Sequence, residues 1–186
     1  MPLTFSVFLP RTVLACATLA LSASALAQVP APNRFEEDFD DESKPWQEIA
    51  VQLPPAPLKE NLLPFSVGVN ATQSFAIDAK SITVGADEVV RYTLVSTSPA
   101  GARNVSYEGI RCQSFELKLY AFGHPNGAWS RSRRDKWEPI AKSVINLQHA
   151  TLAGEYFCIG KSVAGTAAQM VERIRNQRSL SPHVAN

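Results

Sequence analysis

The sequence predicts an α+β domain: a twisted antiparallel sheet of five to seven strands with a C-terminal helix packed on one face. Two observations predict this class. From residue 75 to residue 119, apolar and polar side chains alternate between turn signals, which is typical of antiparallel strands on a core. After residue 165 the apolar residues recur every three or four positions, as in an amphipathic helix. The chain of 186 residues is long enough for one such domain.

The clearest strand is expected over residues 88–96, followed by a turn at residues 98–101 that contains proline and glycine. In the returning strand, residues 105–112, the apolar side chains change from odd to even positions across Gly109. An extra residue in a strand shifts its side chains to the other face. We therefore expect a β-bulge at Gly109.

The next strand, residues 115–119, is expected to bury Phe115, Leu117 and Leu119 and to turn Lys118 outward. A second turn is expected at residues 124–127, which read His-Pro-Asn-Gly. Shorter strands are expected over residues 75–77, over residues 81–84 and, ahead of a proline-rich crossing, over residues 46–53.

The C-terminal part is expected to contain a short helix over residues 146–153, a strand over residues 155–159 and the main helix over residues 166–178. The apolar stripe of the main helix consists of Ala167, Met170, Val171 and Ile174. We expect residues 179–186 to form a disordered tail.

The N-terminal part reads as an export signal. Residues 1–27 carry one basic residue, an apolar stretch and a small-residue end, so a signal peptide cleaved after Ala27 is expected. Lipidation of Cys16 is the alternative, giving an outer-membrane lipoprotein. Residues 28–45 form an acidic arm, and residues 46–178 form the single globular domain. The protein is expected to be periplasmic or secreted, with no transmembrane helix after cleavage.

Two cysteines remain after cleavage, Cys112 and Cys158. In an oxidising compartment a disulfide is the expected state, with Cα atoms about 5–6 Å apart. One alternative is a cysteine nucleophile, Cys158, beside His149. The other is a zinc site formed by both cysteines with His124 and His149. The spacing of these residues fits no structural zinc motif, so no metal and no cofactor are expected.

Several short segments suggest a family. They are Asp38-Phe-Asp, Trp46-Gln-Glu, Leu53-Pro, Val89-Val-Arg-Tyr-Thr, the run from Asn104 to Cys112, Trp129, Trp137 and Tyr156-Phe-Cys. With these the chain resembles the cryptic neisserial protein-like family, small exported proteins of Gram-negative bacteria. The resemblance implies export and a shared fold, and it implies no activity.

Two groups of residues are candidates for binding. The basic segment, residues 131–136, lies between two tryptophans and could contact anionic lipid headgroups, glycan acids or nucleic acid. The alternative is a solvated loop whose tryptophans pack in the core. The second group, charged residues in apolar strands, is expected to hold a buried ion pair drawn from Arg91, Glu108 and Arg111. The binding candidates are Glu108, Arg111, Trp129, Arg131, Arg133, Arg134 and Trp137.

The sequence contains no catalytic motif, and its formal net charge of +1 argues against general nucleic-acid binding. These observations favour a non-catalytic interaction or structural protein whose partner is another envelope component. A small-ligand or lipid carrier is the alternative, followed by an envelope hydrolase. A deep apolar cavity would favour the carrier, and a cleft in which His124 or His149 meets Glu108 would favour the enzyme.

Overall fold

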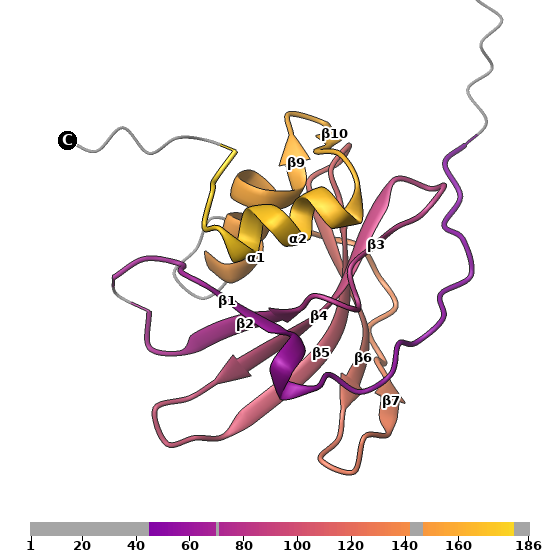
Figure 1. The fold of residues 1–186 in the computed structure, drawn as a ribbon. Helices are drawn as coiled ribbons and strands as arrows, with labels where there is room; N and C mark the ends of the chain where they lie inside the picture. Colours follow the sequence, from indigo (N-terminus) through magenta and orange to yellow (C-terminus); the bar gives the residue numbers. More distant parts are fainter. Residues whose placement is uncertain (1–44, 70, 142–146, 181–186) are drawn as a thin grey trace, which may run out of the picture. The chain divides into compact units, whose positions relative to one another are not determined.

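The computed structural model describes residues 45–69, 71–141 and 147–180 (Figure 1). The expected signal peptide, nearly all of the acidic arm and Cys16 lie outside the described residues. The strands are β1 (Leu62–Phe65), β2 (Ser74–Asp78), β3 (Thr83–Val84), β4 (Val89–Thr97), β5 (Arg103–Arg111), β6 (Glu116–Gly123), β7 (Trp129–Arg131), β8 (Glu138–Pro139), β9 (Cys158–Ile159) and β10 (Ser162–Val163). The helices are η1 (Lys59–Asn61), α1 (Leu147–Thr151), η2 (Leu152–Phe157) and α2 (Ala167–Arg175).

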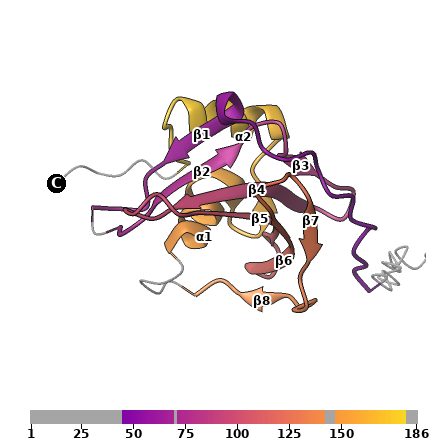
Figure 2. The ribbon, with the colours of Figure 1, turned by 90° about the horizontal axis from the view of Figure 1, so that it is seen from below.

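The main sheet is antiparallel and confirms the predicted α+β class. Its strands follow the order β1-β2-β4-β5-β6-β7, with β3 paired to β4 and β8 paired to β6. These two attached strands have two residues each and bring the sheet to eight strands, one more than the upper expectation. Figure 2 shows β7 and β8 on the side of the sheet away from β1.

The hairpin of β4 and β5 forms the centre of the sheet, as the alternation predicts. The two strands pair without interruption from Val89 opposite Arg111 to Thr97 opposite Arg103. The turn between them closes through the amide of Gly101, which donates to Ser98 O at 2.9 Å. Every residue of β4 from Val89 to Val95 is buried, so this strand is covered on both faces.

Different parts of the chain cover the two faces (Figure 1). The helices α1, η2 and α2 lie on one face and enclose the main core, with side chains such as Tyr92, Phe157 and Met170 at 0% exposure. An extended segment, residues 45–58, which we call the strap, crosses the other face. Its Val51 and Leu53 pack against a second apolar cluster around Tyr107 and Tyr120.

The strap is not the β-strand that its alternation predicts. Residues 46–53 pair with no strand, and the strap is held mainly by side chains. The indole Nε1 of Trp46 donates to Asp87 O at 2.9 Å, and the amide of Ile49 donates to Asp87 Oδ2 at 3.1 Å. The expectation was wrong because the segment contacts the sheet through side chains and not through a strand ladder: Val51 and Leu53 pack inward at alternate positions, whereas Ile49 is exposed.

The β-bulge lies in β6, not at Gly109. The register of β5 against β4 is continuous. Against β6 it shifts: Tyr107 of β5 lies opposite Ala121, and the next residue, Glu108, lies opposite Leu119, so Tyr120 is the extra residue in β6. The apolar positions in β5 change from odd to even because the strand contributes to both apolar clusters: Tyr107 packs in the cluster beneath the strap, and Ile110 packs in the main core beneath the helices. A Cβ atom on Gly109 would lie 2.7 Å from Tyr120 Oη, so glycine leaves room for the bulged tyrosine.

The C-terminal region is more helical than predicted. After α1 the chain continues as the π-helix η2 through Phe157, where the sequence predicts a strand from residue 155. The helix α2 begins at the predicted place, with a capping box between Thr166 and Gln169. The expected tail begins at residue 179, yet the amide of Leu180 donates to Glu155 O at 2.8 Å. No helix in the described residues is long and apolar enough to cross a membrane.

The predicted disulfide is confirmed. Cys112, directly after β5, bonds to Cys158 at the start of β9, with the two Cα atoms 5.6 Å apart. Both cysteines are buried. The bond therefore ties the centre of the sheet to the end of η2.

Candidate functional site

A buried polar cluster lies on the helix-covered face, where β5 meets α1. The carboxylate of Glu108 accepts hydrogen bonds from Ser106 Oγ at 2.6 Å and from Tyr92 Oη at 3.0 Å. Its Oε2 also lies 3.0 Å from His149 Nε2. The side chains of Glu108 and His149 are only 7% and 10% exposed, so the pair is shielded from solvent.

The electrostatics of this cluster favour a charged Glu108. Burial disfavours a carboxylate, but the charge of His149 and hydrogen bonds from His149, Ser106 and Tyr92 together hold the pKa of Glu108 below its ordinary value. Burial, followed by the neighbouring Glu108, raises the pKa of the Tyr92 hydroxyl well above its ordinary value. Tyr92 therefore stays a hydrogen-bond donor to the carboxylate.

His149 and Glu108 meet in the buried interior of the described residues and not in one of the hollows described below. The Ser106 hydroxyl donates to Glu108, so it is not presented to His149 as a nucleophile to a base. Neither Glu108 nor His149 lines any of the hollows described below. The pair links α1 to the sheet across 41 positions of sequence, which is a structural role.

The single ion pair expected among Arg91, Glu108 and Arg111 is not formed. Residues directly opposite each other in a sheet share a face, and Arg91 lies opposite Gly109 while Glu108 lies opposite Tyr92. Arg91 and Glu108 therefore point to opposite faces. Arg91 instead pairs with Asp87 at 2.6 Å.

Arg111, the other candidate, stacks on a strap residue. Its guanidinium carbon lies 3.9 Å from the centre of a Trp46 ring, and its Nη2 donates to Gln113 Oε1 at 2.8 Å. A guanidinium over an indole face is a favourable cation–π contact. The residue thus fixes the strap to the end of β5.

A second charged cluster lies beneath the strap. The Glu48 carboxylate accepts hydrogen bonds from Tyr120 Oη at 2.6 Å and from Lys118 Nζ at 2.7 Å, and it lies 3.6 Å from Arg91. Lys118 also pairs with Asp135 at 2.6 Å. The prediction that Lys118 faces outward was wrong, because the strap covers that face and leaves the residue only 9% exposed.

The pKa values in this cluster favour charged partners. Burial opposes the charge of Lys118, but Asp135 and Glu48 outweigh it and raise the pKa of the lysine. Burial would also raise the pKa of Asp87, yet hydrogen bonds from Arg91 and the Ile49 amide lower it. These groups hold the strap in place.

The basic segment, residues 131–136, is held at both ends by tryptophan. Trp129 donates from Nε1 to Pro54 O at 2.8 Å, and Trp137 packs edge-on to Trp46 with ring centres 5.8 Å apart. The tryptophans therefore pack against the strap. The basic side chains between them are exposed, and they are Arg131, Arg133, Arg134 and Lys136.

The only acidic residue of this segment, Asp135, is neutralised by a lysine of β6. Asp135 pairs with Lys118, whereas the four basic side chains form no ion pair with any residue that the structure describes. The segment therefore presents a local excess of positive charge on a loop whose ends are fixed.

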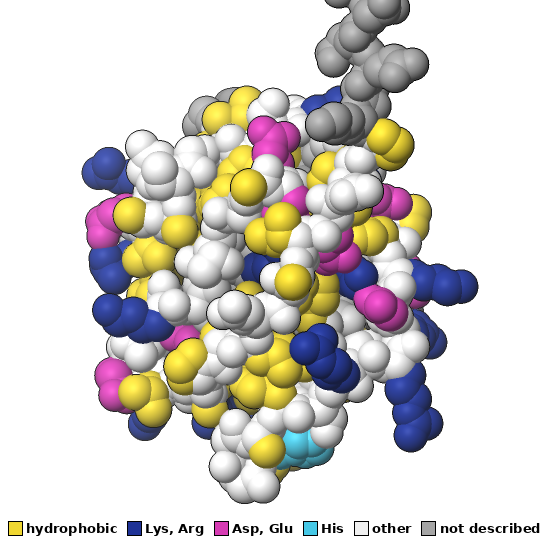
Figure 3. Space-filling view, turned by 90° about the vertical axis from the view of Figure 1, so that its right-hand side faces the viewer, with side chains coloured by type: hydrophobic (Ala, Val, Ile, Leu, Met, Phe, Trp, Pro, Cys, Tyr) yellow, Lys and Arg dark blue, Asp and Glu magenta, His cyan; other side chains and the backbone are white. Residues whose placement is uncertain are grey.

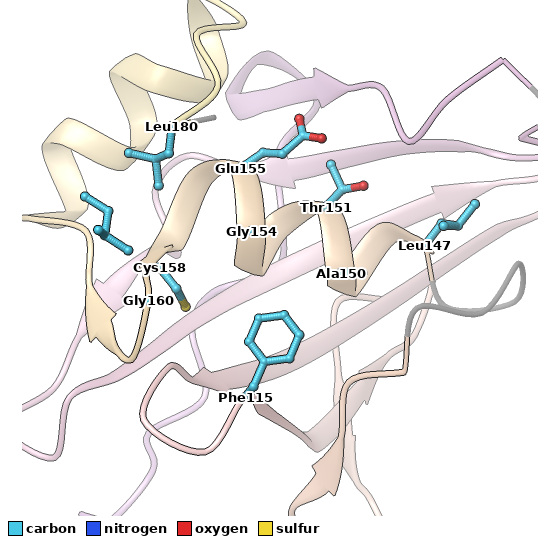
Figure 4. Close-up of a pocket in the computed structure, with 10 residues that line it drawn as sticks. Phe115, Leu147, Ala150, Thr151, Gly154, Glu155, Cys158, Gly160 and Leu180 are labelled. Atoms are coloured by element: carbon cyan, nitrogen blue, oxygen red, sulfur yellow. The ribbon is translucent and has the colours of Figure 1, made fainter. Parts of the chain in front are cut away.

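An apolar pocket of about 570 Å³ lies beside the π-helix (Figure 4). Gly154 forms part of its wall, and a Cβ atom at this position would meet nothing within 4 Å. Phe115 on the opposite wall has a φ of 56°, which is rare for a bulky side chain. The pocket is lined by Phe115, Leu147, Ala150, Thr151, Gly154, Glu155, Cys158, Ile159, Gly160 and Leu180. π-Helices and unusual backbone angles both concentrate at functional sites.

A smaller groove of about 270 Å³ lies between the end of the strap and the turn from β6 to β7. Figure 3 views the molecule from this side and shows hydrophobic side chains gathered near a basic side chain and a histidine. We call it the turn groove, and its residues are Ala56, Pro57, Arg103, Val105, Gly123, His124, Pro125, Gly127 and Trp129.

The structure rules out the two alternatives that need Cys112 and Cys158 as free thiols. Both thiols are joined in the disulfide, so neither a cysteine nucleophile nor a cysteine-containing zinc site is present. Among the described residues, no three side chains of His, Cys, Asp or Glu are grouped so that they could hold a metal ion. His124 lies beside Ser130, with Nε2 and Oγ 2.6 Å apart.

Sequence reasoning missed the partners of the candidate residues. Glu48, Tyr120 and Ser106 each sit in the charged or polar clusters, but none belongs to a recognisable motif. The only signal was Glu48, the one charged residue in the alternating stretch over residues 46–53. The structure brings Trp129, Trp137 and the basic segment together and leaves Glu108 on the other face.

The sheet covered on both faces, the disulfide and the C-terminal helix define a small disulfide-bonded α+β protein. The chain belongs to the CNP1-like family, whose model matches residues 41–175 and so spans the sheet, both α-helices and the disulfide. This agrees with the resemblance to a family without assigned activity. No curated protein and no solved structure matches the chain.

Proposed function

We propose that this protein is a non-catalytic interaction protein of the periplasm that binds an anionic component of the envelope through the basic segment. The observation that carries the proposal is the exposed group of four basic side chains on a loop whose ends are fixed by Trp129 and Trp137. A fixed loop loses little conformational entropy on binding, and clustered cations attract anionic surfaces.

The remaining polar clusters support a non-catalytic role. Glu108 and His149 are buried against each other, and Glu48 is bonded to Lys118 and Tyr120. Catalytic groups must reach a substrate, and these groups are engaged in holding α1 and the strap on the sheet. The disulfide is consistent with an oxidising compartment.

Charge reversal tests the proposal. The protein is mixed with washed envelope membranes at low salt, and the bound fraction is measured after sedimentation. We expect binding that salt weakens and that Arg133→Glu with Arg134→Glu abolishes. The matched control, Lys80→Glu with Lys161→Glu, makes the same change in net charge at exposed sites elsewhere.

The two variants decide the outcome together. Equal loss of binding in both would show that only net charge matters, and unchanged binding in the first would contradict the proposal. Repeating the assay with protein-free vesicles of anionic lipid separates a lipid surface from an envelope protein. The intact mass of the exported protein tests location, since cleavage after Ala27 predicts a chain that begins at Gln28 without a lipid.

The pocket beside the π-helix supports a second candidate, a carrier of small apolar ligands. Gly154→Phe would place a ring in the open space there, whereas Gly154→Ala adds one methyl group to the same position. For a carrier we expect laurate to bind the wild type and Gly154→Ala alike and to fail with Gly154→Phe. Similar binding by all three, or no binding to the wild type, would reject the carrier.

A further inference from the structure

We propose that the turn groove binds a small carboxylate that bears a flat apolar ring. The groove lies on the surface between three separate parts of the chain: the end of the strap, the start of β5, and the turn that joins β6 to β7. Its volume of about 270 Å³ suits one ring with a short polar group rather than a long chain. This inference does not depend on the basic segment.

The charge of the groove selects an anion. Arg103 is an exposed lining residue that forms no ion pair within the described part of the chain. None of the residues lining the groove is acidic, so no carboxylate of the groove itself would compete for the guanidinium. A guanidinium binds a carboxylate through two parallel hydrogen bonds, which gives both strength and orientation.

The apolar lining selects a ring. Trp129, Pro57 and Pro125 supply flat or rigid side chains to the groove, and Val105 adds an aliphatic surface. Flat faces of this kind favour stacking with a planar ligand. A ligand that joins a ring to a carboxylate can therefore contact the apolar lining and Arg103 at once.

The groove is formed before any ligand arrives. Trp129 is fixed by its hydrogen bond to Pro54 O and by an edge contact with Tyr107, whose ring centre lies 6.2 Å away. Gly123 allows this arrangement, because a Cβ atom there would lie 2.8 Å from Val105 Cγ1 and 3.3 Å from Trp129 Cζ3. A preformed site spends little of its binding energy on ordering.

Nuclear magnetic resonance of the exported protein can test this site. The chain has three tryptophans, and Trp129→Phe assigns the indole Nε1–H signal of Trp129. The probe is phenylacetate, compared with 2-phenylethanol, which keeps the ring, and acetate, which keeps the charge. We expect phenylacetate to shift the Trp129 signal with saturation and a dissociation constant of about 1 mM or tighter, and each comparison compound to bind at least about tenfold more weakly.

Two arginine variants supply the matched comparison. Arg103→Gln should weaken phenylacetate binding by about tenfold, because it removes the charged donor. Arg178→Gln removes an exposed arginine that lies beyond the end of α2 and outside the groove lining, and it should leave binding unchanged. A Trp129 signal that does not saturate, equal binding of 2-phenylethanol, or equal effects of the two variants would overturn the proposal. None of these outcomes bears on envelope binding by the basic segment.

Discussion

Reduction of the Cys112–Cys158 disulfide is expected to lower the free energy of unfolding by about 4 kcal/mol. The bond joins residues 46 positions apart. In the chain-entropy model, opening a loop of this length returns about 13 cal/mol/K to the unfolded chain, which is about 4 kcal/mol at 25 °C. For a domain of this size, the melting temperature should fall by about 12 °C.

Urea unfolding followed by circular dichroism measures this difference. The oxidised protein is compared with the same protein in reductant and with the double variant Cys112→Ala, Cys158→Ala. Reduction removes no side-chain atoms, so it isolates the cross-link, whereas the double variant also leaves a small cavity in the core. We therefore expect the order of stability to be oxidised, then reduced, then double variant.

Two results would refute this reasoning. A loss below about 1 kcal/mol on reduction would show that the loop is already restrained in the unfolded state. Stoichiometric reaction of the native, non-reduced protein with a thiol reagent would show that the bond is not formed. Cys158→Ser should cost about 2–5 kcal/mol, and a smaller loss would point the same way.

Three further predictions concern single residues. Gly109→Ala should destabilise the fold by about 1–3 kcal/mol in urea unfolding, because its methyl group would meet the ring of Tyr120; an unchanged midpoint would contradict the bulge. Thr166→Ala should cost about 1 kcal/mol by removing the capping box with Gln169, and Thr166→Ser should retain most of the stability. Because the pKa of Glu108 is lower in the folded state than in the unfolded state, the unfolded chain binds more protons as the pH falls below 4.5, and stability falls with it. Thermal unfolding measured as a function of pH tests this. The melting temperature of Glu108→Gln should fall less steeply on acidification than that of the wild type, and an identical fall would exclude the contribution of Glu108.

The sequence predicted the parts of the fold that rest on local signals. The hairpin of β4 and β5 combines alternation with a Pro-Ala-Gly turn, and α2 combines an apolar stripe with a capping threonine. Both signals act over a few residues, so a single sequence carries them. The pairing of Cys112 with Cys158 was predicted from the expected oxidising compartment and from the two cysteines expected to remain after cleavage.

The parts that failed depend on what covers each face. The alternation in the strap is the same for a strand and for an extended segment on a sheet, and the outward place given to Lys118 assumed an open face. The partner of Glu108 lies 41 residues away on a helix, so no local pattern indicates His149. The π-helix was missed because Tyr156 and Phe157 favour strands by propensity, and tertiary packing outweighs propensity.

The two ends of the main sheet path have a consequence for association. Edge strands expose unpaired backbone groups that can template the addition of another strand. At one end, β1 has four residues and carries an exposed proline, Pro64, which has no amide hydrogen to donate. At the other end, β7 has only three residues. Neither end of the main sheet path is therefore a good template for the addition of a strand from another chain, which disfavours edge-to-edge aggregation.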